Sequence, residues 1–169
     1  MASFDANRVT PIEWAGIGAG VLAFISSFFP WYSLSFSGSS LAFAGISTSL
    51  TAWGVGLLGW LPVLLLVAAA VLILLPHFGN AVKNQPLIWL ILAAVSVVFI
   101  IIRWLTLSSS SGIGALGADS GISDGAGFGL YLGLLAAVVS TVAAFLTFRA
   151  APRAAPGHPG QPNPGYPAA

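Results

Sequence analysis

Long apolar runs alternate with shorter polar stretches along this chain. The runs lie at residues 12–29, 53–75, 87–107 and 128–148. A helix that crosses the hydrocarbon core of a bilayer needs about 20 apolar residues, because the core is about 30 Å thick and each helical residue rises about 1.5 Å. Since each run is close to that length, the pattern predicts an all-α membrane protein, a bundle of four transmembrane helices.

The stretch after the first run has a different periodicity. Pro30 is expected to end the first helix, and Trp31 to lie among the aromatic side chains of the membrane interface. Apolar and polar residues then alternate over residues 32–37, which is typical of a strand. Residues 38–40 are suited to a turn, and residues 41–43 would begin a returning strand. The sequence therefore predicts a short β-hairpin in the first outer loop, supported by the membrane domain because two strands alone are marginally stable.

The start of the first run carries a helix-capping pattern. Thr10 is suited to the N-cap, Pro11 to the first helical position and Glu13 to the third. There the carboxylate accepts a hydrogen bond from a free backbone N–H and meets the positive end of the helix dipole. An acid inside a membrane would instead indicate a proton or cation site. The position of Glu13 at the expected water interface favours the cap.

Small residues recur every four positions in two of the runs. They are Gly16 and Gly20 in the first run, and Gly129, Gly133, Ala137 and Thr141 in the fourth, with Gly125 at the same spacing just before it. Residues four apart share one face of a helix, and small side chains let two helices approach closely. These faces are expected to pack within one bundle, with packing between protomers as the alternative.

Arg103 is the one charged residue of the third run. An ionisable residue inside a span is a candidate functional site. Arg103 lies about one turn from the end of the run at Leu107, so its long side chain can instead snorkel to the interface beside Trp104. If it is paired, the expected partners are Asp119 and Asp124 in the following connector. Both interpretations stay open at this stage.

Two further segments are predicted from composition. The connector at residues 108–127 is rich in Ser and Gly and is expected to be a flexible loop, with Ser123 or Asp124 capping the last helix. Six of the residues in 150–169 are proline, so this tail is expected to be disordered. The expected organisation is therefore a segment at residues 1–10, a membrane domain at 11–149, and the tail.

Composition agrees with lipid as the surrounding medium. The chain is 57% hydrophobic and only 5% charged, whereas soluble domains carry about 25% charged residues. The formal net charge of +1 gives no reason to expect nucleic-acid binding. The sequence contains no cysteine, which excludes disulfides and thiolate chemistry, and we expect no cofactor or metal.

The basic residues predict an orientation. With four spans, Arg8, Lys83, Arg149 and Arg153 lie on one side of the membrane and Arg103 on the other. Basic residues favour the cytoplasmic side. Both termini are therefore expected in the cytoplasm, with the protein in the plasma (inner) membrane.

Two short stretches resemble a known group of proteins. They are Phe28-Phe29-Pro30-Trp31-Tyr32 after the first run and Pro164-Gly165-Tyr166-Pro167 in the tail. With the layout, they resemble small four-span membrane proteins of actinobacteria, including mycobacterial ones, and the resemblance implies a bacterial cell membrane. The layout is also similar to that of claudins, but the claudin Gly-Leu-Trp motif and paired cysteines are missing, so that likeness implies layout alone.

These observations lead to two expected functions. The first is an interaction or accessory subunit without a catalytic site, in a larger envelope or respiratory assembly, that binds a membrane-protein partner or a second copy of itself. The alternative is a small channel or transporter, which needs a polar path. The candidates for that path are Ser26, Ser27, Ser96, Ser140, Thr141 and Arg103. An enzyme is not expected, because two histidines and four scattered acids do not converge on a site.

Overall fold

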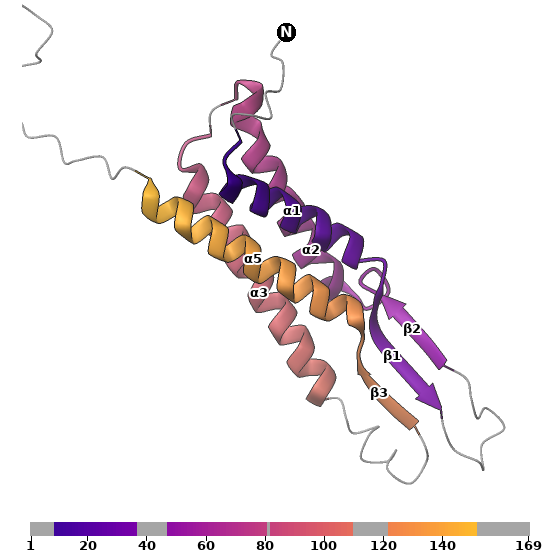
Figure 1. The fold of residues 1–169 in the computed structure, drawn as a ribbon. Helices are drawn as coiled ribbons and strands as arrows, with labels where there is room; N and C mark the ends of the chain where they lie inside the picture. The colour runs from indigo at the N-terminus through magenta and orange to yellow at the C-terminus, as the bar shows by residue number, and fades with distance from the viewer. Residues whose placement is uncertain (1–8, 37–46, 81, 110–121, 152–169) are drawn as a thin grey trace, which may run out of the picture.

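The structure, a computed structural model, describes residues 9–36, 47–80, 82–109 and 122–151. The elements in chain order are α1 (Pro11–Ser26), β1 (Pro30–Phe36), β2 (Ser47–Thr51), α2 (Leu57–Leu74), the 3-10 helix η2 (Leu75–Phe78), α3 (Gln85–Ser109), β3 (Ile122–Ala126) and α5 (Phe128–Ala150). The helices lie side by side in an elongated bundle, and the strands extend from one end of it (Figure 1).

Three of the helical segments are long and apolar enough to cross a membrane. They are Leu57–Phe78, Gln85–Leu107 and Phe128–Ala150. Helix α1 has 16 residues, fewer than the roughly 20 that a straight span needs. The structure therefore supports a helical membrane protein with three of the four predicted spans, and α1 is shorter than the fourth span that the sequence predicts.

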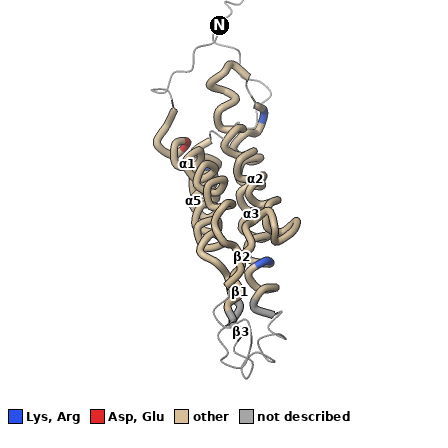
Figure 2. Tube along the Cα trace, turned by 90° about the vertical axis from the view of Figure 1, so that its right-hand side faces the viewer, with Lys and Arg blue, Asp and Glu red and all other residues tan. Residues whose placement is uncertain are grey.

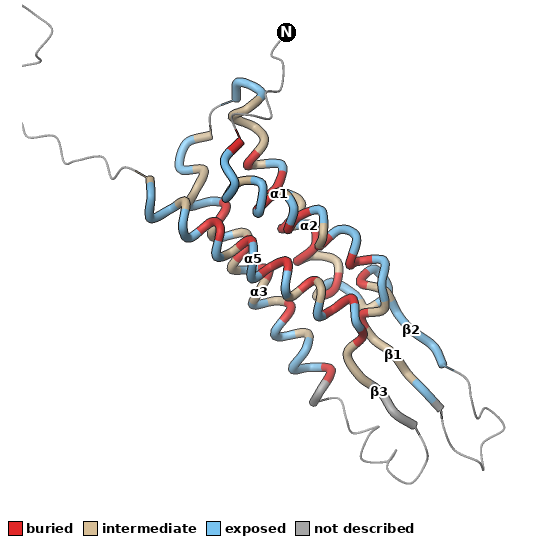
Figure 3. The backbone as a smooth tube through the Cα atoms, viewed as in Figure 1, coloured by how far each residue is buried: buried red, intermediate tan, exposed pale blue. Residues whose placement is uncertain are grey.

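Large apolar side chains cover the outside of all four helices. Phe24 on α1, Val71 on α2, Ile91 on α3 and Val142 on α5 are each about half exposed. Exposed residues lie along the outer faces of the bundle, whereas buried residues face its interior (Figure 3). Soluble monomers rarely expose continuous apolar surface of this extent, so this exterior is suited to contact with lipid.

The four helices pack as a ring around an interior of small side chains. Helix α1 packs against α2 and α5, and α3 packs against the same two helices. The wholly buried interior residues include Ala23, Ala69, Ala93, Ala136 and Ala137. Small side chains allow the close helix contacts that drive association where lipid replaces water.

Gly20 lies at a close approach between α1 and α2. A Cβ added there would lie 2.6 Å from the Cβ of Ala70 and 3.0 Å from the carbonyl oxygen of Leu66. Gly16, one turn earlier, faces the indole of Trp89 from α3 and the side chain of Ile73. This small-residue face therefore packs within the bundle of a single chain.

The strands form one antiparallel sheet with β1 at its centre. The order is β2-β1-β3, and Ser33 of β1 pairs with Ser49 on one side and Gly125 on the other. The predicted hairpin is present as β1 and β2. The predicted turn at residues 38–40 and the strand start at 41–43 lie outside the described residues.

The prediction of a flexible loop before the last helix is wrong for residues 122–126. These residues form β3, because pairing with β1 satisfies the backbone groups of both strands. The helix that follows begins at Phe128 with Gly127 at its N-cap and no side-chain cap. Ser123 and Asp124 therefore do not cap it as predicted, since both belong to the strand.

Two helix boundaries also differ from the apolar runs. Helix α1 ends at Ser26 because the chain turns into β1 at Pro30. Helix α2 begins at Leu57, after Gly56, whose φ of 90° lies in the left-handed region that favours glycine. Both spans predicted from hydrophobicity are therefore too long, because they include apolar residues of the connections between helix and sheet.

Helix packing around Gly20 can be tested with a pair of alanine substitutions. Gly20→Ala adds a methyl group against Ala70 and should lower the free energy of unfolding by about 1–3 kcal/mol, as overpacking does. Gly18 is the matched control because an added Cβ there meets nothing within 4 Å. Gly18→Ala should be neutral or stabilising by up to about 1 kcal/mol. Denaturation in detergent micelles measures both, and equal effects would contradict the close approach.

Candidate functional site

Trp31 is wholly buried where the sheet joins the bundle. Its indole Nε1 donates a hydrogen bond of 2.9 Å to the carbonyl of Ser26 at the end of α1. The ring lies against α5, because a Cβ at Gly129 would be 2.7 Å from its Cδ1 and one at Gly133 would be 2.9 Å from its Cζ2. The indole of Trp31 is therefore enclosed by protein, since the glycines of α5 form a slot that receives it, and its predicted depth at the membrane interface stays a prediction.

The backbone of α5 also approaches the end of α1 closely. A Cβ at Gly129 would lie 2.8 Å from the carbonyl oxygen of Ser26 and 2.9 Å from that of Phe29. The N–H of Gly127 donates to the carbonyl of Trp31 at 3.0 Å. Ala137, further along the predicted packing face, is wholly buried. This face therefore joins α5 to α1 and to the start of β1.

A second tryptophan connects the sheet to the same helix end. The Nε1 of Trp53 donates to the hydroxyl of Ser27 at 3.2 Å, and that hydroxyl donates to the carbonyl of Phe24 at 2.6 Å. The N–H of Ala52 donates to the carbonyl of Ser27 at 3.1 Å. The start of β1, through Trp31, and the residues after β2, through Ala52 and Trp53, are therefore hydrogen bonded to the C-terminal end of α1.

The buried hydroxyl groups of the bundle have partners within it. The hydroxyl of Ser96 lies 2.8 Å from the carbonyl of Leu92 and 3.2 Å from that of Pro62. The hydroxyl of Ser26 donates to the carbonyl of Ala23 at 2.8 Å. In the middle of the bundle, the Nε1 of Trp89 donates to the hydroxyl of Ser140 at 3.1 Å. These candidates for a polar path are hydrogen bonded to neighbouring protein groups.

Thr10 and Glu13 form the capping box at the start of α1. The N–H of Thr10 donates to the Glu13 carboxylate at 2.8 Å, and the N–H of Glu13 donates to the Thr10 hydroxyl at 3.3 Å. His77 of η2 places its Nε2 3.9 Å from the same carboxylate. Its Nδ1 lies 3.1 Å from the carbonyl of Ile73. This contact between two helices does not follow from residue spacing in the sequence.

Arg103 is half-buried on α3, less than two turns from the end of that helix. Its Nε is buried and has no hydrogen-bond partner among the described residues. Asp119 lies outside the described residues, and so does the side chain of Asp124, whose backbone pairs with Leu34 in the sheet. A pair between Arg103 and either acid therefore stays a prediction.

Charged positions are few on the described trace, and they lie toward the ends of the helices (Figure 2). Within the part of the chain that the structure describes, no three His, Cys, Asp or Glu side chains gather where they could hold a metal ion. The candidate site is instead a junction between the helical bundle and the sheet. It is formed by Trp31, Trp53 and the end of α1.

The fold and this junction define the class of protein as a helical membrane protein that carries a small antiparallel sheet. Comparison of the chain with protein-family models, with curated proteins and with solved structures found no match.

The junction can be tested by removing the Trp31 indole. Trp31→Ala should lower the free energy of unfolding by about 3–5 kcal/mol, because it empties the slot between α1 and α5. Hydrogen exchange of β1 and β3 should accelerate, since both strands are held beside this side chain. Trp14→Ala is the control, because Trp14 is 47% exposed on α1 and its loss should change stability by about 0.5 kcal/mol or less. Equal effects would contradict the role of Trp31.

Proposed function

We propose that the chain is a four-span membrane protein without a catalytic site, acting as an interaction or accessory subunit of a larger membrane assembly. The observation that supports this proposal most directly is the sheet at one end of the bundle. It is attached through the buried Trp31 and extends beyond the end of α1 and the starts of α2 and α5, with α3 alongside it (Figure 1). A sheet fixed in this way is suited to present a protein-binding surface in a defined orientation.

The exposure of strand β2 supports a role in binding. Every residue from Ser47 to Leu50 is exposed, and Leu50 and Trp53 each have 44% of their surface accessible. Among the described residues, β2 pairs with β1 alone and lies at the margin of the sheet. The margin of a sheet offers backbone donors and acceptors to an added strand, and the exposed apolar side chains add contact area.

The surface of α1 supports its assignment as the fourth span. It packs between α2 and α5 as an equal member of the ring. Its exposed side chains are apolar, and Phe28 and Phe29 extend that surface beyond the last helical residue. A helix of this length is accommodated by local thinning of the bilayer at modest cost.

The distribution of basic residues supports cytoplasmic termini. Arg149 lies at the C-terminal end of α5, and Lys83 lies in the connector between η2 and α3. With four spans, both fall on the membrane side opposite the sheet. The positive-inside tendency then places the termini in the cytoplasm of a bacterial cell and the sheet outside.

Photo-crosslinking from the sheet tests the interaction role. A photoreactive residue at Thr48 of β2 should cross-link one partner protein in native membranes, and the same protein should co-purify in a fixed ratio after mild detergent extraction. Val98 is the control position, because it is 52% exposed on the lipid-facing side of α3. A monomer that yields no adduct from Thr48, or equal adducts from both positions, would contradict the proposal.

A flux measurement tests the channel alternative. Conduction needs a continuous polar path. The buried hydroxyls described above are instead hydrogen bonded within the bundle, so we expect purified chain in liposomes to pass ions no faster than empty liposomes. Flux that is present in wild type and lost in Arg103→Ala would overturn the accessory role in favour of a channel.

A further inference from the structure

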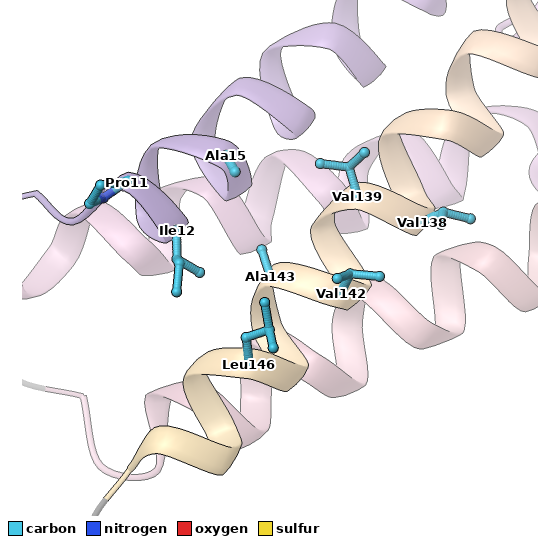
Figure 4. Close-up of a pocket in the computed structure, with 8 residues that line it drawn as sticks. All are labelled: Pro11, Ile12, Ala15, Val138, Val139, Val142, Ala143 and Leu146. Atoms are coloured by element: carbon cyan, nitrogen blue, oxygen red, sulfur yellow. The ribbon is translucent and has the colours of Figure 1, made fainter.

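An apolar groove of about 370 Å³ lies on the outside of the bundle between α1 and α5. The side chains that line it include Pro11, Ile12 and Ala15 of α1 and Val138, Val142 and Leu146 of α5 (Figure 4). All of these groups are aliphatic. The groove is therefore suited to a hydrocarbon chain and offers nothing to a polar ligand along its length.

Arg149 lies on α5 beyond one end of this groove, outside the residues that line it. Positions 138, 142, 146 and 149 follow one stripe of α5, because residues three and four apart share a helix face. Arg149 thus continues the line of Val142 and Leu146 by one turn, in the last turn of the helix. Its guanidinium carbon lies 5.4 Å from the ring centroid of Phe145, and the side chain is exposed.

The acid at the same end of the bundle is engaged elsewhere. Glu13 lies in the first turn of α1, but it does not line the groove between α1 and α5. Its carboxylate accepts from Thr10 and lies 3.9 Å from the Nε2 of His77, which belongs to η2 after α2. Among the described residues, Arg149 is therefore the charged residue that continues the α5 stripe of the groove.

A second groove gives a useful contrast. It lies between α1 and α2, measures about 330 Å³, and is lined by apolar residues that include Val21, Phe24 and Val71. Neither of its helices carries a basic residue in its last turn. The groove beside α5 thus differs in having a cation, Arg149, on one of its helices about one turn beyond its last lining residue.

We propose that the groove between α1 and α5 binds one acyl chain of an anionic phospholipid, whose phosphate pairs with Arg149. This inference rests on the membrane location in the proposed function. A guanidinium can give two parallel hydrogen bonds to a phosphate, which favours this headgroup chemistry. Since the N-terminus of α1 and the C-terminus of α5 lie at the same end of the bundle, the lipid comes from the leaflet on the side of the chain termini.

Native mass spectrometry of the full chain, released from detergent micelles with added lipid, tests the headgroup contact. The probes are phosphatidylglycerol and phosphatidylcholine with identical acyl chains. Wild type should bind phosphatidylglycerol more tightly, and Arg149→Gln should weaken that binding about fivefold. Arg149→Lys should keep most of the preference because the charge remains. Lys83→Gln is the matched charge control and should leave the preference unchanged.

A second pair of variants tests the groove. Ala15 is exposed and lines it, so Ala15→Phe should fill it and weaken the binding of both lipids. Ala68→Phe adds the same volume at an exposed site of α2 that lines neither groove, and it should leave lipid binding unchanged. Helical circular dichroism of each variant verifies folding, and Ala15→Leu replaces Ala15→Phe if that variant unfolds.

The outcomes separate this inference from the proposed function. Equal phosphatidylglycerol binding by wild type and Arg149→Gln, or equal losses in Arg149→Gln and Lys83→Gln, would overturn the lipid site. Unchanged lipid binding in the groove-filling variant would also overturn it, and a partner helix cross-linked at Ala15 would then be the occupant. If wild type prefers phosphatidylglycerol as expected but Thr48 gives no adduct, the accessory role is contradicted and the lipid site is not.

Discussion

The burial of Trp31 is the contact on which the rest of the structure depends. Its indole needs a slot on α5, which Gly129 and Gly133 provide, and an acceptor, which the carbonyl of Ser26 provides. Both needs are met where α1 stops at Ser26 and the chain passes into β1 beside the start of α5. The same connection starts β1 as the central strand, and the N–H of Gly127 then donates to the carbonyl of Trp31 and aligns β3 beside it. One side chain thereby connects a short helix, a glycine face and a three-stranded sheet.

The sequence predicted the elements that follow from periodicity and missed those that depend on partners distant in the chain. Hydropathy was sufficient for α3 and α5, and for α2 except at its start, because each apolar run there coincides with one helical segment. It extended α1 too far, since the apolar residues after Ser26 pack at the junction without being helical. The residues of β3 have no clear alternation, so only the pairing with β1 defines that strand. The four-residue spacing of Gly129 and Gly133 indicated close packing. The same spacing leaves room for either a neighbouring helix or an indole ring, and a single sequence does not show which of the two fills it.

Lipid as the surrounding medium explains how the buried polar groups are used. In hydrocarbon an unpaired hydroxyl or indole N–H is costly, and water is not there to satisfy it. The hydroxyls of Ser26 and Thr141 meet this constraint locally, by donating to carbonyls three or four residues earlier in their own helices. Trp89 meets it across the bundle through Ser140. The serines that are candidates for a polar path thus have hydrogen-bond partners inside the bundle, and Arg103 is the polar group whose Nε is buried without a partner in the described residues.

The end of α1 at Ser26 also has a consequence at the opposite end of the bundle. With Ser26 held beside Gly129, α1 has 16 residues against the 23 of α5, so α5 continues beyond the start of α1 by roughly six residues, or about 9 Å. Leu146 and Arg149 lie in this overhang, and the groove that begins at Pro11 opens onto it. A short helix beside a long one leaves apolar surface and a terminal cation that no element of the described chain covers. The junction that fixes the sheet at one end thus leaves, by the difference in helix length, an overhang of α5 beyond the end of the groove at the other.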